Sequence, residues 1–176
     1  MPNHFFKHKP TLLALAIASV VSTQFAQAEE FTITRTSDDS DTGSLRWAID
    51  QANALEGEDT IVFDNALIGQ SIGINDELRV SDSLIINGLG VDHLSIIQES
   101  QVYGSDLFIT DSDLTINNLT LTGNSSNTGM LINARGSEND EPKPKLTILR
   151  SSLVADNSSF SGIDSRYFDV DISESN

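Results

Sequence analysis

The feature of this sequence that most constrains its fold is a weak internal repeat. The segment LTINNLTLTG, which begins at Leu114, aligns without gaps with LTILRSSLVA, which begins at Leu146. A more degenerate copy opens with LIIN at Leu84, so successive copies begin 30 and 32 residues apart. A repeat of that length indicates an architecture in which neighbouring units stack and bury a core that no single unit can bury alone.

Each period of the repeat favours strands. Two consecutive periods hold three short runs each, rich in Leu, Ile and Thr, at residues 84–87, 94–97 and 107–110, and at residues 114–117, 119–121 and 130–133. Gly, Asn, Asp and Ser separate the runs, as turns require, and no long apolar stripe at helical spacing accompanies them. The pattern predicts an all-β fold, a parallel β-helix (solenoid), whose aliphatic core includes Ile116, Leu121, Ile148 and Leu153.

The region before the repeat predicts a cap. Residues 31–34 alternate as in a strand, and residues 44–54 place four apolar side chains on one helical face: Leu45, Ala48, Ile49 and Ala52. Ser44 suits the N-cap, and Gly57 suits the end of the helix. A stack of strands needs a cover on its first edge. We therefore expect an N-terminal cap of one strand and one amphipathic helix over residues 29–58, followed by coils over residues 59–176.

One segment interrupts the strand pattern. Residues 136–145 are rich in charge and contain Pro142 and Pro144, which cannot donate to a strand ladder. The composition predicts a loop that projects from the coils. A solvated connection is favoured over a functional arm.

Residues 1–28 have the three regions of a secretory signal peptide in order. A basic start is followed by an apolar run over residues 11–21 and by the small-residue site Ala26-Gln27-Ala28. A single membrane anchor is the alternative, but the apolar run is too short to span a bilayer comfortably. The sequence predicts an exported protein, secreted, periplasmic or on the outer surface, whose mature chain begins at Glu29.

The charge balance excludes some partners. The chain has 10 Lys and Arg against 26 Asp and Glu, which gives a formal net charge of −16. Such a chain repels nucleic acid and anionic membranes, so neither is expected as a main partner. No second apolar stretch is long enough to cross a membrane, so we expect no membrane insertion of the mature chain. Because Cys is absent, packing and backbone hydrogen bonds must hold the fold.

The stretch GSLRWAIDQAN at residues 43–53, followed by DTIVF at residues 59–63, resembles the N-terminal signature of right-handed parallel β-helix repeat surface proteins. The residues of this structural cap motif are Ser44, Leu45, Arg46, Ala48, Ile49, Ala52 and Asn53. The repeats are similar to those of polymorphic outer-membrane proteins and autotransporter passengers. The resemblance implies a right-handed solenoid at the surface of a Gram-negative bacterium. The chain departs from that pattern in having Gly43 where many relatives have Cys, and in being much shorter.

These features lead to three hypotheses of function. The first is a secreted or cell-surface β-helix protein with an adhesin-like or structural role and no catalysis, whose partner is carbohydrate or a host or cell-surface ligand. The second is a β-helix that acts as a polysaccharide lyase or hydrolase, or that binds carbohydrate. The third is a truncated remnant of a longer autotransporter passenger. The first is favoured because the sequence shows no convergent set of reactive residues.

The same lack of a reactive set leaves the catalytic and cofactor-binding residues unassigned. The predicted mature chain has one histidine, His93, at a bend between strands, and a lone histidine in a turn is more often solvated than catalytic. Lyase chemistry needs a proton acceptor and basic groups that neutralise a carboxylate. Arg135 and Arg150 are the basic residues that could face one groove.

A weak calcium site is the one metal hypothesis. Asp38, Asp39 and Asp41 lie in the acidic run DDSDTG. Counted from Asp38, Gly43 takes the sixth position of an EF-hand loop, but the twelfth position is Ile49 in place of Glu. The alternative is an acidic turn before a helix N-terminus, where the helix dipole favours negative charge.

Overall fold

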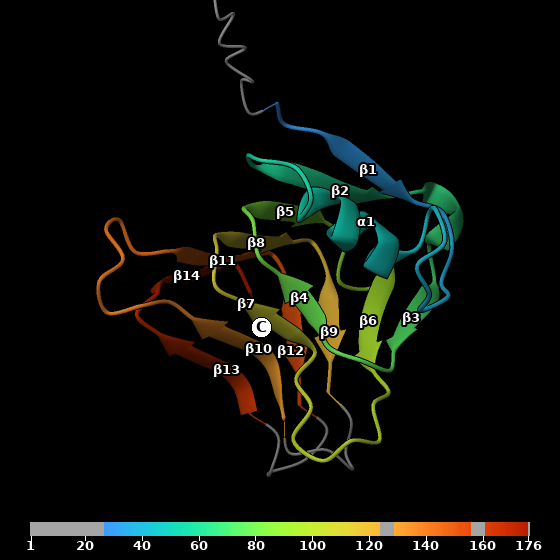
Figure 1. Cartoon of the computed structure of the whole chain (residues 1–176). Helices are drawn as coiled ribbons and strands as arrows, with labels where there is room; N and C mark the ends of the chain where they lie inside the picture. The colour runs from blue at the N-terminus through green and yellow to red at the C-terminus, as the bar shows by residue number, and fades with distance from the viewer. Residues whose placement is uncertain (1–26, 124–128, 156–160, 176) are drawn as a thin grey trace, which may run out of the picture.

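The computed structural model describes residues 27–123, 129–155 and 161–175 (Figure 1). Residues 1–26 of the predicted signal peptide lie outside this range, as do two short parts of the predicted coils, residues 124–128 and 156–160. The described chain is mostly β-structure with little helix. It contains no helix with the length and apolar character needed to cross a bilayer.

The predicted cap is formed by β1 (Glu30–Ile33) and α1 (Leu45–Ala52). The helix begins where Ser44 accepts a hydrogen bond from the backbone N–H of Trp47 at 3.1 Å, which satisfies one of the unpaired amides of the first turn. It ends two residues before the predicted end, with Asn53 as its C-cap. The four residues of its apolar stripe are buried, as the spacing predicts.

Strands follow the helix in regular succession. A short 3₁₀ helix, η1 (Asn65–Leu67), lies between the first two of them. The strands are β2 (Asp59–Phe63), β3 (Gln70–Ile74), β4 (Leu78–Val80), β5 (Leu84–Asn87), β6 (Leu94–Gln98), β7 (Phe108–Thr110), β8 (Leu114–Asn117), β9 (Thr120–Thr122), β10 (Met130–Arg135), β11 (Lys145–Leu149), β12 (Ser152–Val154), β13 (Ser161–Arg166) and β14 (Asp169–Ser173).

The strands form three parallel sheets. The six-stranded sheet has the order β1-β2-β5-β8-β11-β14, and the four-stranded sheets have the orders β3-β6-β9-β12 and β4-β7-β10-β13. From β2 onward the chain visits the three sheets in rotation, and we call three successive strands, one in each sheet, a pass. In Figure 1, β1 and α1 lie at one end of the resulting stack and β13 lies at the other. The prediction of a mainly β fold built from parallel strands is confirmed.

The strand register reproduces the sequence repeat. Leu84 pairs with Leu114, and Leu114 pairs with Leu146, so the three repeat starts lie in one column across β5, β8 and β11. Leu121 pairs with Leu153 across β9 and β12 in the same way. Equivalent positions of the repeat are therefore neighbours in space, one pass apart.

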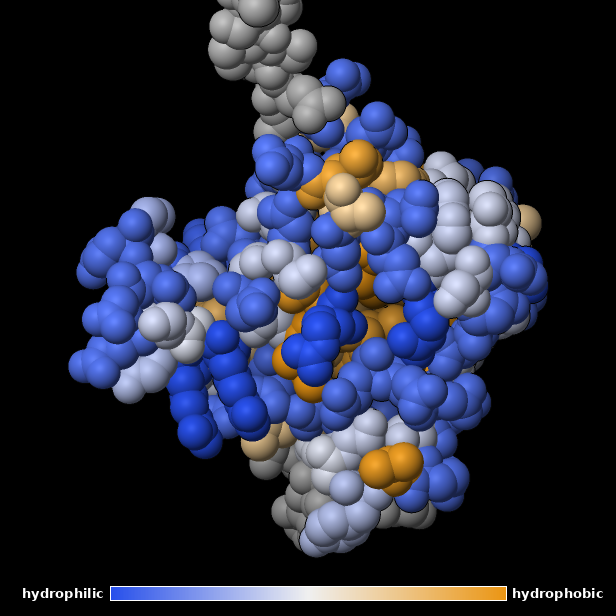
Figure 2. Space-filling model, viewed as in Figure 1, coloured by the Kyte–Doolittle hydropathy of each residue, from blue (hydrophilic) through white to orange (hydrophobic). Residues whose placement is uncertain are grey.

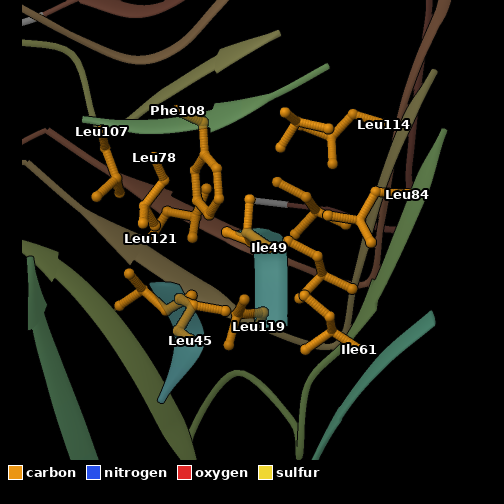
Figure 3. Close-up of a cluster of buried hydrophobic side chains, with 14 of the residues drawn as sticks. Leu45, Ile49, Ile61, Leu78, Leu84, Leu107, Phe108, Leu114, Leu119 and Leu121 are labelled. Carbon is orange, nitrogen blue, oxygen red and sulfur yellow. The ribbon is translucent and has the colours of Figure 1, made fainter. Parts of the chain in front are cut away.

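The core is one cluster of mostly aliphatic side chains from α1 and from strands of the three sheets. Ile116, Leu121 and Ile148 are fully buried, as predicted. Figure 3 shows Leu84 and Leu114 in this cluster together with Ile49 of α1. Leu153 is only half-buried, which corrects the prediction for that residue. The reason is its place on β12, the last strand of its sheet, where no described strand covers it.

Arg46 and Asn53 of the cap motif bond to the backbone of β4 and of the residues beside it, and β4 is an edge strand of its sheet. The guanidinium of Arg46 donates to the backbone oxygens of Asp76 and Glu77, at 2.7 and 3.1 Å. Asn53 donates to the backbone oxygen of Arg79 at 2.8 Å and accepts from the N–H of Ser81 at 2.8 Å. An exposed edge would otherwise offer these backbone groups to another chain. The motif therefore closes one end of the stack.

The predicted loop lies between β10 and β11, where residues 136–144 contain no strand and extend away from the sheets in Figure 1. Hydrophilic residues cover most of the face drawn in Figure 2, and apolar residues show in a hollow near its centre and beside β1. Trp47 packs edge-on against Phe31 of β1, with ring centroids 5.8 Å apart, so it covers the core at the end of the stack where β1 and α1 lie.

Candidate functional site

An open hollow of about 670 Å³ lies where successive passes turn from the six-stranded sheet to the sheet of β3, β6, β9 and β12. It collects polar side chains from positions far apart in the sequence. Its lining residues are Gly90, Val91, Asp92, His93, Asn118, Thr120, Arg150, Ser151, Ser152, Val154 and Glu174. Because the turns of neighbouring passes lie beside one another, a site can form here from residues that no single sequence motif contains.

Three lining residues share an unusual backbone conformation. Asn118, Arg150 and Glu174 have φ values of 54, 46 and 52°, in the left-handed region. Asn enters this region readily, whereas Arg and Glu do so at a cost in conformational energy. Each directly follows a strand of the six-stranded sheet, and the strand ends pair in register through Leu149. The three residues therefore form a column of bends beside the hollow.

Arg150 is held at the centre of this column. Its guanidinium donates to the side-chain oxygens of Asn117 and Asn118, at 2.8 and 3.2 Å. Asn117 in turn donates to the side-chain oxygen of Asn87 at 3.2 Å. The acidic partner of Arg150 is Glu174, at 3.7 Å, and the side chains of the two are 50% and 72% exposed. An exposed ion pair of this length is weak, so a bound anion can replace Glu174 at little cost.

His93 is oriented by the backbone of its own turn. Its Nδ1 lies 3.0 Å from the carbonyl oxygen of Leu89. Because a carbonyl can only accept, Nδ1 carries the proton of this hydrogen bond, and the neutral ring keeps a lone pair on Nε2. Gly90 has a φ of 119°, and a Cβ there would lie 2.9 Å from Nδ1 of His93. A glycine is thus required both for the turn and for the position of the ring.

The sequence predicted the position of only some of the residues that line this hollow. It expected His93 to be solvated at a bend; the side chain is exposed, and it also lines the hollow. Arg135 and Arg150 do not share a groove, because Arg135 lines a different hollow with Asp111 and Asp140. Glu174 was missed, since nothing in its sequence neighbourhood marks it as an equivalent of Arg150.

The proposed calcium ligands Asp38 and Asp41 are each paired with an arginine. Asp38 accepts from Nε of Arg46 at 2.8 Å and from the backbone N–H of Asn75 at 2.8 Å. Asp41 lies 3.4 Å from Arg35. In the part of the chain that the structure describes, no three His, Asp or Glu side chains are grouped to hold a metal ion. Calcium binding stays a prediction here, and the observed contacts tie the acidic loop to the cap.

Asp39 lies in the same loop and accepts from Arg35 at 2.9 Å. The backbone N–H of Asp41, which donates to Asp39 at 3.0 Å, lowers the pKa of Asp39 below its usual value. Ser37 and the charge of Arg35 lower this pKa further, against the opposing effect of desolvation. The carboxylate therefore stays ionised and keeps the loop folded over the start of α1.

Comparison with known proteins gives a match to part of the chain. No protein-family model matches the chain, and no solved structure matches it. The chain is similar to a 3-dehydroshikimate dehydratase of Acinetobacter baylyi, with 43% identity over 63 residues. The match covers 36% of this chain and 11% of that protein, so the chain spans only a small part of the length of the curated relative.

This similarity corrects the leading functional hypothesis. The relative is named as an enzyme, so the prediction of an adhesin-like or structural protein without catalysis is wrong. That prediction was based on the lack of a reactive set within any stretch of sequence. In the fold, His93, Arg150 and Glu174 come from separate passes and line one hollow.

Proposed function

We propose that this chain is part of an exported right-handed parallel β-helix enzyme that dehydrates a small hydroxylated carboxylate, such as 3-dehydroshikimate. The observation that carries the proposal is the placement of His93 and Arg150 on one hollow, in a chain that is similar to a dehydratase. The two residues supply the two functions that such a reaction needs, a proton carrier and an anchor for an anion.

The rotation of the strands through three sheets supports the β-helix. The right hand follows from the strong preference of parallel crossover connections and from the resemblance of residues 43–63 to β-helix surface proteins. Export is supported by the three regions of residues 1–28, with their small-residue site before Glu29. The strong negative charge of the chain argues against a nucleic-acid partner.

The proposed chemistry uses His93 as the proton carrier. Its Nε2 takes the proton from a carbon next to the carbonyl of the substrate. The C–O bond of the neighbouring hydroxyl then breaks, a C=C bond forms, and the same proton leaves with the hydroxyl as water. No oxidant or reductant is needed. A histidine suits both steps because one imidazole nitrogen can accept a proton and release it again.

Arg150 holds the carboxylate of the substrate. The side-chain oxygens of Asn117 and Asn118 fix the plane of its guanidinium, so its remaining N–H groups face the hollow in a defined direction. A guanidinium binds a carboxylate through two parallel hydrogen bonds, which selects planar anions over neutral sugars. Glu174 occupies this position weakly when no substrate is bound.

The test is an assay of the full chain with 3-dehydroshikimate, in which loss of water yields the aromatic 3,4-dihydroxybenzoate and a new ultraviolet absorption. We expect His93→Gln to reduce turnover at least about 100-fold, because Gln cannot carry a proton. Tyr103→Phe is a matched control, since this exposed ring lies in a different hollow. The proposal fails if the wild-type chain neither forms the aromatic product nor binds the substrate, or if His93→Gln is as active as the control.

A further inference from the structure

Asp59, the first residue of β2, is a buried carboxylate with half of its bonding capacity unmet. The residue is 0% exposed. Its Oδ1 accepts a hydrogen bond from the backbone nitrogen of Glu29 at 2.8 Å. Its Oδ2 is buried and has no hydrogen-bond partner among the described residues. A single neutral N–H is poor compensation for the desolvation of a carboxylate, so this position calls for a stronger donor.

The donor to Oδ1 of Asp59 is the backbone nitrogen of Glu29, and removal of the signal peptide would turn this nitrogen into a free amino group. Glu29 directly follows the small-residue site Ala26-Gln27-Ala28. Cleavage after Ala28 turns the amide nitrogen of Glu29 into an α-ammonium group with three donors and a positive charge. The residue is already fixed in place, because its backbone oxygen accepts from the N–H of Thr60 at 2.8 Å. The new charge would therefore arise within hydrogen-bond distance of Asp59.

We propose that Asp59 is the receptor for the mature N-terminus. After cleavage, the α-ammonium group of Glu29 binds both oxygens of Asp59 and forms a buried ion pair at the start of β1. This inference depends on the proposed export of the chain and is independent of the dehydratase activity. Charge-assisted hydrogen bonds are about twice as strong as neutral ones. Processing thus supplies a partner for one of the three buried side-chain oxygens that lack one among the described residues, the others belonging to Gln98 and Asn133.

The ion pair would fasten the cap of the stack. β1 pairs with β2 in parallel from Glu30 to Ile33, and it lies at the edge of the six-stranded sheet. The ring of Phe31 on this strand packs against Trp47 of α1. Holding the start of β1 therefore also holds the helix that covers the core. The processed chain is expected to be more stable than the same chain with a blocked amino group.

The experiment begins with the full-length chain expressed in a Gram-negative host. The mass of the exported product shows whether it starts at Glu29. The purified protein is then treated with an acetylating reagent until its mass spectrum shows that the α-amino group is modified, which restores a neutral N–H at the same atom. We expect acetylation to lower the melting temperature by about 4 °C or more. Asp59→Asn, treated identically, keeps an acceptor for Glu29 and controls for acetylation of lysines, so its melting temperature should not fall.

A second measurement needs no variant. In the native protein the α-amino group should react with the acetylating reagent at least about tenfold more slowly than in the urea-unfolded chain, because the ion pair keeps it protonated. An exported product that starts elsewhere than Glu29 overturns the inference. Equal melting temperatures before and after acetylation, or equal reactivity in the native and unfolded chains, also overturn it. Neither result bears on turnover of 3-dehydroshikimate.

Discussion

The two ends of the stack contain similar side chains and differ in what covers them. At the capped end, α1 and β1 lie over the first strands, and Ile33, Leu45 and Ile61 are fully buried. At the other end, β12, β13 and β14 are the last described strands of their sheets. Val170 and Ile172 of β14 are 43% and 51% exposed. We call these the capped end and the open end.

One column of the six-stranded sheet makes the difference plain. Ile116, Ile148 and Ile172 pair in register across β8, β11 and β14. The first two are fully buried and the third is half exposed. The residue type and its position in the pass are the same in all three, so burial depends on whether another layer follows. Stability in such a stack is a property of neighbouring layers.

The largest expected effect comes from a charge in the middle of this column. Ile116→Asp places an unpaired carboxylate among fully buried aliphatic side chains, and we expect it to cost about 4 kcal/mol or more and to abolish cooperative unfolding. Ile172→Asp, the matched change at the open end, should cost less than about 1 kcal/mol. Thermal unfolding followed by far-ultraviolet circular dichroism checks both. Similar losses in the two variants would mean that the open end is covered in solution.

The polar contacts of the cap should give an intermediate effect. Arg46→Met removes the hydrogen bonds to Asp38, Asp76 and Glu77 and leaves the edge of β4 without them. We expect a loss of about 1–3 kcal/mol in the free energy of unfolding, measured with urea.

Arg166→Met is the matched control for this prediction at the open end. Arg166 pairs with Asp164 at 3.4 Å, and its side chain is 66% exposed, so its loss should stay within about 0.5 kcal/mol. If Arg46→Met and Arg166→Met lost equally little free energy of unfolding, the cap motif would stabilise the chain through its apolar residues alone.

The smallest effect concerns pH at the capped end. The pKa of Asp39 is lowered in the folded chain, chiefly by the backbone N–H of Asp41. Its stabilisation is therefore complete above the unfolded-state pKa of about 3.9 and is lost as the pH falls through the lower folded-state value. We expect Asp39→Asn to melt below the wild type at neutral pH, and the two melting temperatures to converge in acid. A constant difference at every pH would contradict this.

The sequence predicted the stacking of parallel strands because the period of the repeat shows which residues occupy equivalent positions. The starts at Leu84, Leu114 and Leu146 were aligned correctly because stacked passes need equivalent residues at equivalent positions. The helix over residues 45–52 followed from its apolar spacing and its N-cap. Leu153 was misplaced because the sequence pattern does not say which layer lacks a neighbour.

The candidate site could not be predicted in the same way. Its geometry depends on the left-handed backbone of Arg150 and Glu174, and neither residue type signals that conformation. The turn that orients His93 needs Gly90, which the sequence offers only as one glycine among several. The prediction that Arg135 and Arg150 could face one groove was wrong. The bends of the backbone decide which side of a pass each residue faces, and the spacing of residues in the sequence does not reveal those bends.

The column of bends has a consequence for ligand access. Arg150 follows β11, whereas its acidic partner Glu174 follows β14 at the open end. Fraying of β14 alone would release the guanidinium from its counter-ion and leave undisturbed the imidazole of His93, whose turn follows β5, three strands away in the same sheet. Detachment of the outermost layer and capture of an anion are then thermodynamically linked, so a bound carboxylate favours the frayed state, and fraying raises the affinity for the carboxylate.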